Sequence, residues 1–163
     1  KLKSVFKKNG TITAANASTI NDGAAVCLLS SEQQCLDLGL SAKARILDSV
    51  SFSHEPKWFT TAPVGAIIKI LEKNNLTIND IDLFEINEAF SVVPLVAAKE
   101  LNINIDKLNI HGGAVSLGHP IGCSGARIII SLINALRLNN KKIGVASICI
   151  GGGEATAMLI EVL

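Results

Sequence analysis

The residues best able to do chemistry stand in three short segments of the chain. Asn87-Glu-Ala-Phe90 follows an apolar stretch, and residues 111–127 contain five glycines around His119. His119 stands between Gly118 and Pro120, which stiffens the loop that carries an imidazole able to exchange protons near neutral pH. Residues 147–153 place Cys149 before three glycines, so a thiol acid/base could act beside an oxyanion site made of free N–H groups.

Each segment also has an interpretation without chemistry. Asn87 could be a helix N-cap and nothing more. Cys149 could be a buried structural cysteine before a turn. We expect a structural role for three further residues, His54, His111 and Cys123, and a place as core or surface filler for Cys27 and Cys35. Without a CxxC pair or zinc-type spacing, the four cysteines predict reduced thiols in a reducing compartment.

The elements that must position these segments alternate between strands and helices. The patterns predict five strands, at residues 23–30, 44–52, 81–86, 142–149 and 155–162. They predict four helices, at residues 32–38, 63–74, 87–101 and 122–138. This alternation favours an α/β domain, a mixed five-stranded sheet with helices on both faces. Functional groups should gather at strand ends and helix starts.

Composition excludes several other classes of protein. Hydrophobic residues make up 48% and charged residues 18%, which is typical of a globular chain. The net charge of +1 predicts no nucleic-acid or anionic-membrane partner. No uninterrupted apolar run reaches the ~18 residues of a spanning helix, so we expect no membrane segment. No signal peptide is expected from residues 1–8, and the initial Lys suggests that the chain is processed or part of something longer.

Taken together, the three motifs resemble those of thiolases, in particular the acetyl-CoA acetyltransferase type. The matching residues are Asn87-Glu-Ala-Phe90, Gly112-Gly113…Gly118-His119-Pro-Ile-Gly122…Ser124-Gly-Ala-Arg127 and Cys149-Ile-Gly-Gly-Gly153. The resemblance begins near Gly10 and covers essentially the whole chain. It implies that residues 1–163 are a thiolase C-terminal domain that takes part in Claisen condensation of two acetyl-CoA to acetoacetyl-CoA and in the reverse thiolysis.

The resemblance also implies roles for single residues. His119 matches the histidine that activates a nucleophilic cysteine and helps form an oxyanion hole, and Asn87 matches the asparagine that holds the water completing it. Cys149 matches the acid/base cysteine, and Gly151 an N–H donor of the second oxyanion hole. Contacts to coenzyme A are implied for Ser18, Ala89 and Phe90. Backbone carbonyls facing a potassium ion, as in mitochondrial-type members, are implied for Ala14, Ala15, Ala17 and Val115.

One catalytic group of the family has no match here. Thiolases carry the acyl group on a cysteine of their N-terminal half, and none of Cys27, Cys35 or Cys123 stands in that motif. We therefore expect this chain to be inactive on its own, and to bind acetyl-CoA, acetoacetyl-CoA and coenzyme A within a homodimeric or homotetrameric enzyme without a cofactor. The expected location is the cytoplasm, or mitochondria in a eukaryote.

Three alternatives remain open from the sequence. A 3-ketoacyl-CoA thiolase of fatty-acid β-oxidation would share these motifs. A ketoacyl synthase is disfavoured, because Cys149 stands where such enzymes use a histidine. A truncated, non-catalytic chain that only packs or assembles would explain the missing nucleophile.

Overall fold

A computed structural model describes residues 2–163 and shows a mixed sheet between two layers of helices. The α-helices are α1 (Glu32–Asp37), α2 (Ala62–Lys73), α3 (Val92–Leu101), α4 (Ala114–Leu117) and α5 (Ile121–Leu138). The strands are β1 (Ala44–Ser53), β2 (Leu83–Ile86), β3 (Ile143–Ile150) and β4 (Glu154–Val162). Short 3-10 helices η1 (Pro56–Thr61), η2 (Ile78–Asp80) and η3 (Ile105–Lys107) connect them.

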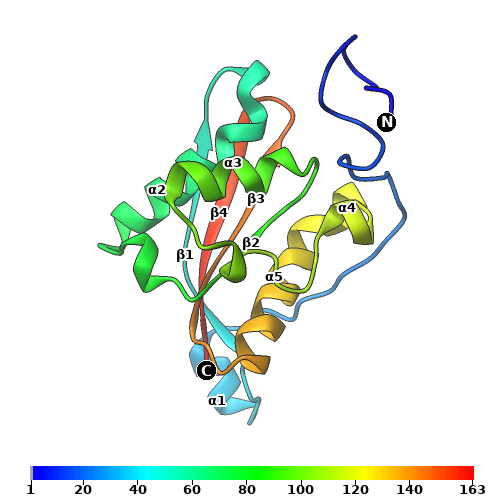
Figure 1. Ribbon diagram of the computed structural model, residues 1–163. Coiled ribbons are helices and arrows are strands. Elements are labelled where there is room, and N and C mark those ends of the chain that lie inside the picture. The colour runs from blue at the N-terminus through cyan, green and yellow to red at the C-terminus, as the bar shows by residue number, and fades with distance from the viewer. Residues whose placement is uncertain (1) are drawn as a thin grey trace.

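The four strands lie in the order β1-β4-β3-β2, with β2 parallel to β3 and the other two pairings antiparallel. Helices α2 and α3 cover one face and α5 covers the other, as Figure 1 shows. The predicted α/β class with helices on both faces is therefore confirmed. The predicted count of five strands is wrong by one.

The missing strand is the one predicted at residues 23–30. This segment has no regular structure, and in Figure 1 it passes outside α5 on its way to α1. Its large side chains are exposed, with 88% of Val26 and 85% of Leu28 accessible to solvent. A strand is stabilised by hydrogen bonds to a neighbouring strand, and the described residues offer this segment none.

The packed helices form where apolar residues recur at helical spacing and end where asparagine reverses the backbone. The buried face of α2 carries Pro63, Ala66, Ile67, Ile70 and Leu71, with Pro63 in the first turn, where a proline costs no hydrogen bond. Asparagine adopts the left-handed conformation just after three helices, at Asn75, Asn102 and Asn140. Its short polar side chain tolerates that conformation better than most residues do.

Helix α5 bears on the expectation that the chain has no membrane segment. Its 18 residues have a mean hydropathy of 1.4, so among the described residues it is long and apolar enough to cross a membrane. Such a helix is weak evidence for a span, because a core helix passes the same test. Ile128, Leu132 and Leu136 of α5 are buried against the sheet. Arg127 also projects from this helix toward a buried carboxylate.

Candidate active site

The site forms where β2 and β3 end side by side. The two strands are parallel, with Ile86 opposite Ser147, and the Asn87 N–H donates to the Ser147 carbonyl at 2.9 Å. Asn87 therefore follows β2 at the same sheet edge at which Cys149 approaches the end of β3. This is the edge where side chains from different segments of an α/β protein can converge.

Asn87 is not a helix cap. Helix α3 begins at Val92 after Ser91, five residues later than predicted, so the interpretation of Asn87 as an N-cap is wrong. Its side chain is 1% exposed and contacts two others, because Nδ2 lies 3.3 Å from His119 Nε2 and Oδ1 accepts from Arg127 Nη2 at 3.2 Å.

His119 is held at its backbone and at both ring nitrogens. Its N–H donates to the Thr19 carbonyl at 2.9 Å, and its Nδ1 lies 2.7 Å from Ser124 Oγ in the first turn of α5. Burial, and then the charge of Arg127, lower the pKa of His119 below its ordinary value. The imidazole is thus a neutral base at physiological pH.

The glycine before His119 is required by this arrangement. Gly118 has a φ of +95°, and a Cβ there would stand 2.4 Å from Asn21 Oδ1. The same Asn21 oxygen lies 3.3 Å from the His119 N–H. A side chain at residue 118 would therefore push away the early segment that fixes the histidine loop.

Cys149 is half-buried, and its side chain packs with the core cluster on the α2–α3 face. Burial raises the pKa of the Cys149 thiol, and within residues 2–163 the thiol makes no side-chain hydrogen bond. Cys149 is therefore a thiol rather than a thiolate at rest. Gly151 is exposed, with open space where a Cβ would stand.

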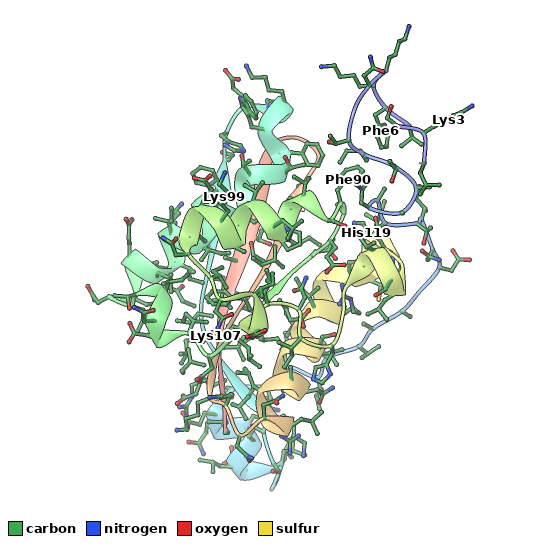
Figure 2. All side chains as sticks on the ribbon, viewed as in Figure 1. Lys3, Phe6, Phe90, Lys99, Lys107 and His119 are labelled. Atoms are coloured by element: carbon green, nitrogen blue, oxygen red, sulfur yellow. The ribbon has the colours of Figure 1, made fainter. Side chains whose placement is uncertain are left out.

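The residues expected to contact coenzyme A come together from two distant parts of the chain. Ser18 donates twice to the Ala89 carbonyl, from its N–H at 3.1 Å and from its hydroxyl at 2.9 Å. Ala17 forms an isolated antiparallel β-bridge with Phe90. The Phe6 and Phe90 rings pack edge to face, with their centroids 5.7 Å apart. Figure 2 shows Phe6, Phe90 and His119 gathered on the same side of the molecule.

The residues expected near potassium include two, Ala17 and Val115, that contact the segment Glu88–Phe90. Ala14, Ala15 and Ala17 lie in or beside a turn, and Ala17 bridges Phe90. Val115 in α4 donates its N–H to Glu88 Oε2 at 3.0 Å. Carbonyls of the three alanines accept no hydrogen bond from the described residues, so these oxygens are free to bind a cation that prefers carbonyl oxygen.

Glu88 braces this region. Oε1 accepts from Asn109 Nδ2 at 2.9 Å, while Oε2 holds the start of α4. A Cβ on Gly113 would stand 2.2 Å from the Glu88 carboxyl carbon, which explains a glycine there. Asn109 in turn bonds both the N–H and the carbonyl of Ile86, as a neighbouring strand would.

Sequence reasoning assigned no separate role to Glu85, Asn109, Ser124 or Arg127. Glu85 was detectable, since a carboxylate inside the apolar run 81–86 needs a partner. Ser124 and Arg127 were noticed only as part of a motif. Asn109 had no local signal, because its partners lie 21 and 23 residues away along the chain.

The sequence and the fold match known proteins over nearly the whole chain. The family model "Thiolase, C-terminal domain" matches residues 40–162, and "Thiolase, N-terminal domain" matches residues 1–33. The chain belongs to the thiolase family.

Similar proteins carry related names. The chain is 51% identical to a probable acetyl-CoA acetyltransferase of Dictyostelium discoideum, covering 99% of this chain and 39% of that protein. The structure of the Acat5 thiolase from Ascaris suum in complex with coenzyme A has a TM-score of 0.95 and 49% identity, covering 99% of this chain and 42% of that one. Human mitochondrial 3-ketoacyl-CoA thiolase has a TM-score of 0.91 and 37% identity, with 100% and 41% covered. The chain thus spans about two fifths of the length of these relatives.

Proposed function

We propose that this chain supplies the acid/base half of an acetyl-CoA C-acetyltransferase site. The observation that carries the proposal is the contact between Asn87 and His119, at a sheet edge where Cys149 also ends its strand. A neutral imidazole and a protonated thiol form a base and an acid ready for one reaction cycle.

The resting protonation states suit thiolysis of acetoacetyl-CoA. Nε2 of His119 would take the proton of a cysteine thiol as that sulfur attacks the ketone carbonyl. The resulting Nε2–H would then donate to the oxyanion, which stabilises the transition state. When the carbon–carbon bond breaks, the Cys149 thiol would protonate the methylene carbon of the leaving acetyl-CoA enolate. The Cys149 thiolate would then take the proton of the coenzyme A thiol as that sulfur attacks the acetyl group on the first cysteine, which leaves with the proton held by His119. This releases the second acetyl-CoA, and condensation follows the same steps in reverse.

The attacking cysteine would come from polypeptide matching the remainder of the relatives' length. We accordingly propose that the chain alone has no thiolase turnover. A chain that served only for packing or assembly would not need the side-chain contacts that orient His119. We therefore prefer the hypothesis that the chain is part of an enzyme.

Acetoacetyl-CoA is favoured as the substrate over 3-ketoacyl-CoA thioesters with longer chains. The relatives near 50% identity are named for acetyl-CoA, whereas the 3-ketoacyl-CoA thiolase is 37% identical. Coenzyme A would lie beside Ser18, Ala89 and Phe90. Coenzyme A binding in general is supported by the similar Acat5 thiolase, which was crystallised in complex with coenzyme A.

We add a potassium ion held by carbonyls of Ala14, Ala15, Ala17 and Val115, where it would supply fixed positive charge beside coenzyme A. Replacing potassium by sodium should then weaken coenzyme A binding. A dimeric or tetrameric assembly and a cytoplasmic or mitochondrial location remain part of the proposal.

The experiment is a fusion. The part of the Ascaris suum thiolase that precedes its match to Lys1 is joined to this chain, and acetoacetyl-CoA cleavage by coenzyme A is measured. We expect turnover by the fusion and none by either part alone. Robust cleavage by the isolated chain, or a folded fusion without turnover, would contradict the proposal.

A further inference from the structure

A continuous hydrogen-bond chain runs through the candidate site from one charged side chain to one backbone carbonyl. Its links are Arg127 Nη2 to Asn87 Oδ1 at 3.2 Å, Asn87 Nδ2 to His119 Nε2 at 3.3 Å and His119 Nδ1 to Ser124 Oγ at 2.7 Å. The last link runs from Ser124 Oγ to the Pro120 carbonyl at 3.1 Å. Asn87 and Ser124 are 1% and 0% exposed, so water does not compete for these middle links.

The charged end group fixes the direction of the hydrogen bonds that lead to His119. A guanidinium can only donate, so the amide of Asn87 must turn its oxygen to Arg127 and its NH₂ to His119. The Ser124 hydroxyl donates to the Pro120 carbonyl, which also accepts the N–H groups of Cys123 and Ser124, so Ser124 Oγ is available to accept from His119. The ring of His119 therefore carries its hydrogen on Nδ1 and its lone pair on Nε2.

We propose that Arg127 is a positioning residue that sets the direction of this hydrogen-bond chain and thereby leaves the lone pair of His119 on Nε2. Without a donor at residue 127, the amide of Asn87 could turn over and present its oxygen to the ring. Nε2 would then need to carry the hydrogen, and the imidazole could no longer accept a proton there.

Glu85 makes a charged donor tolerable at this depth. It is 2% exposed, and its Oε2 lies 3.8 Å from Arg127 Nη1 across the β2–α5 contact, so its carboxylate compensates the guanidinium charge once the proton has left. The Arg127 side chain is itself 19% exposed. Arg127 on α5 and Glu85 on β2, with Glu88 beyond Glu85, are the charged groups around this end of the chain.

The inference rests on the proposed function only for its use, since a base at Nε2 is what the thiolase reaction needs. The position of the hydrogen can be measured without any turnover. Failure of the tautomer assignment and failure of the enzyme proposal are therefore separate results.

The test is ¹⁵N NMR of the histidine rings of this chain at pH 8, where the two ring nitrogens report which one carries the hydrogen. Arg127→Met keeps much of the side-chain volume and removes charge and donors, while Arg127→Lys restores both. His54 and His111 serve as internal references. Arg137→Met is the matched control, because Arg137 lies exposed in the last turn of the same helix.

We expect the unsubstituted chain, Arg127→Lys and Arg137→Met to show His119 protonated on Nδ1 alone. Arg127→Met should show a mixture of both tautomers, and the pKa of His119 should rise. In the active fusion, Arg127→Met should lower kcat roughly 10-fold or more at little changed KM.

Two results would overturn the inference. One is an Nε2–H tautomer in the unsubstituted chain, which stands even if Arg127→Met fails to fold. The other is a folded Arg127→Met variant whose His119 remains purely Nδ1–H. An inactive fusion with the expected tautomers would instead overturn the proposed function alone.

Discussion

Residues 2–43 and residues 44–163 differ in how their apolar side chains are used. In the later region, Ile67, Ile86 and Leu132 are fully buried between sheet and helices. In the earlier region, Ile20 and Val26 are each 88% exposed, and α1 has no buried residue. The early region contacts the later one through single side chains at the candidate site. Ser18 bonds the Ala89 carbonyl, and Phe6 packs on Phe90.

The difference shows that an apolar run becomes a strand only where a sheet accepts it. Residues 23–30 are as apolar as β3, yet they remain unpaired among the described residues. The family models divide the chain in the same region, because the N-terminal-domain match ends at 33 and the C-terminal-domain match begins at 40. The early apolar run therefore belongs with the part of the fold that the thiolase N-terminal domain provides.

The largest expected effect comes from a matched pair of leucine truncations. Leu132→Ala removes a fully buried side chain under the sheet and should lower the free energy of unfolding by about 2–5 kcal/mol. Leu28→Ala removes an exposed one and should change it by no more than about 0.5 kcal/mol. Urea unfolding followed by circular dichroism measures both, and equal losses would refute the division into two regions.

A pH effect should come from the later region alone. Burial raises the pKa of Glu85 from 4.5 to about 7, although Arg127 opposes that shift. The folded state then keeps a proton that the unfolded state loses, so stability falls as pH rises from about 5 to 8, by up to about 3 kcal/mol.

The control for this effect is Glu85→Gln, which should lose this fall and keep only the opposite contribution of His119, whose lowered pKa makes stability rise with pH up to about 7. Asp48, Asp80 and Asp82 have lowered pKa values and act mainly below pH 4. If the parent and Glu85→Gln had identical pH profiles of unfolding free energy, the ionisation of Glu85 would not destabilise the folded state.

A smaller effect should separate two glycines near the site. Gly113→Ala forces a Cβ against the Glu88 carboxyl group and should destabilise the chain by about 1–3 kcal/mol. Gly125→Ala meets nothing within 4 Å and lies inside α5, so it should stabilise by about 0.5–1 kcal/mol. Thermal unfolding of the pair decides, and a harmless Gly113→Ala would remove the proposed brace.

The smallest effect concerns Arg45, which forms one ion pair between the two regions and another within the later region. Arg45 in β1 contacts Glu32 of α1 at 2.8 Å and Glu161 of β4 at 3.4 Å. The Arg45 and Glu32 side chains are 45% and 76% exposed and that of Glu161 is 23% exposed, so Arg45→Ala should cost only about 1 kcal/mol and less at high salt. A larger loss in urea unfolding would mean that α1 is anchored more firmly than its exposure suggests.

The sequence predicted the packed part of this fold well, because periodic apolar faces such as that of α2 are local signals. It placed the start of α3 too early, since Asn87 has the composition of a cap but is used in a contact with His119, 32 residues away. The roles of Glu85, Asn109 and Arg127 could not be predicted in full, because each depends on partners brought together by the sheet. The motifs identified His119 and Cys149, but not which nitrogen of His119 holds a proton.

The central claim is that Cys149 is the acid/base of a thiolase reaction, and it is tested most directly by hydrogen exchange on the substrate. The active fusion is incubated with acetyl-CoA in deuterium oxide, and loss of the methyl proton signal is followed by NMR for the parent and for Cys149→Ala. We predict exchange by the parent and a loss of roughly 100-fold or more in the variant. Exchange at the parent rate in a folded Cys149→Ala fusion would contradict the assignment of Cys149 as the acid/base.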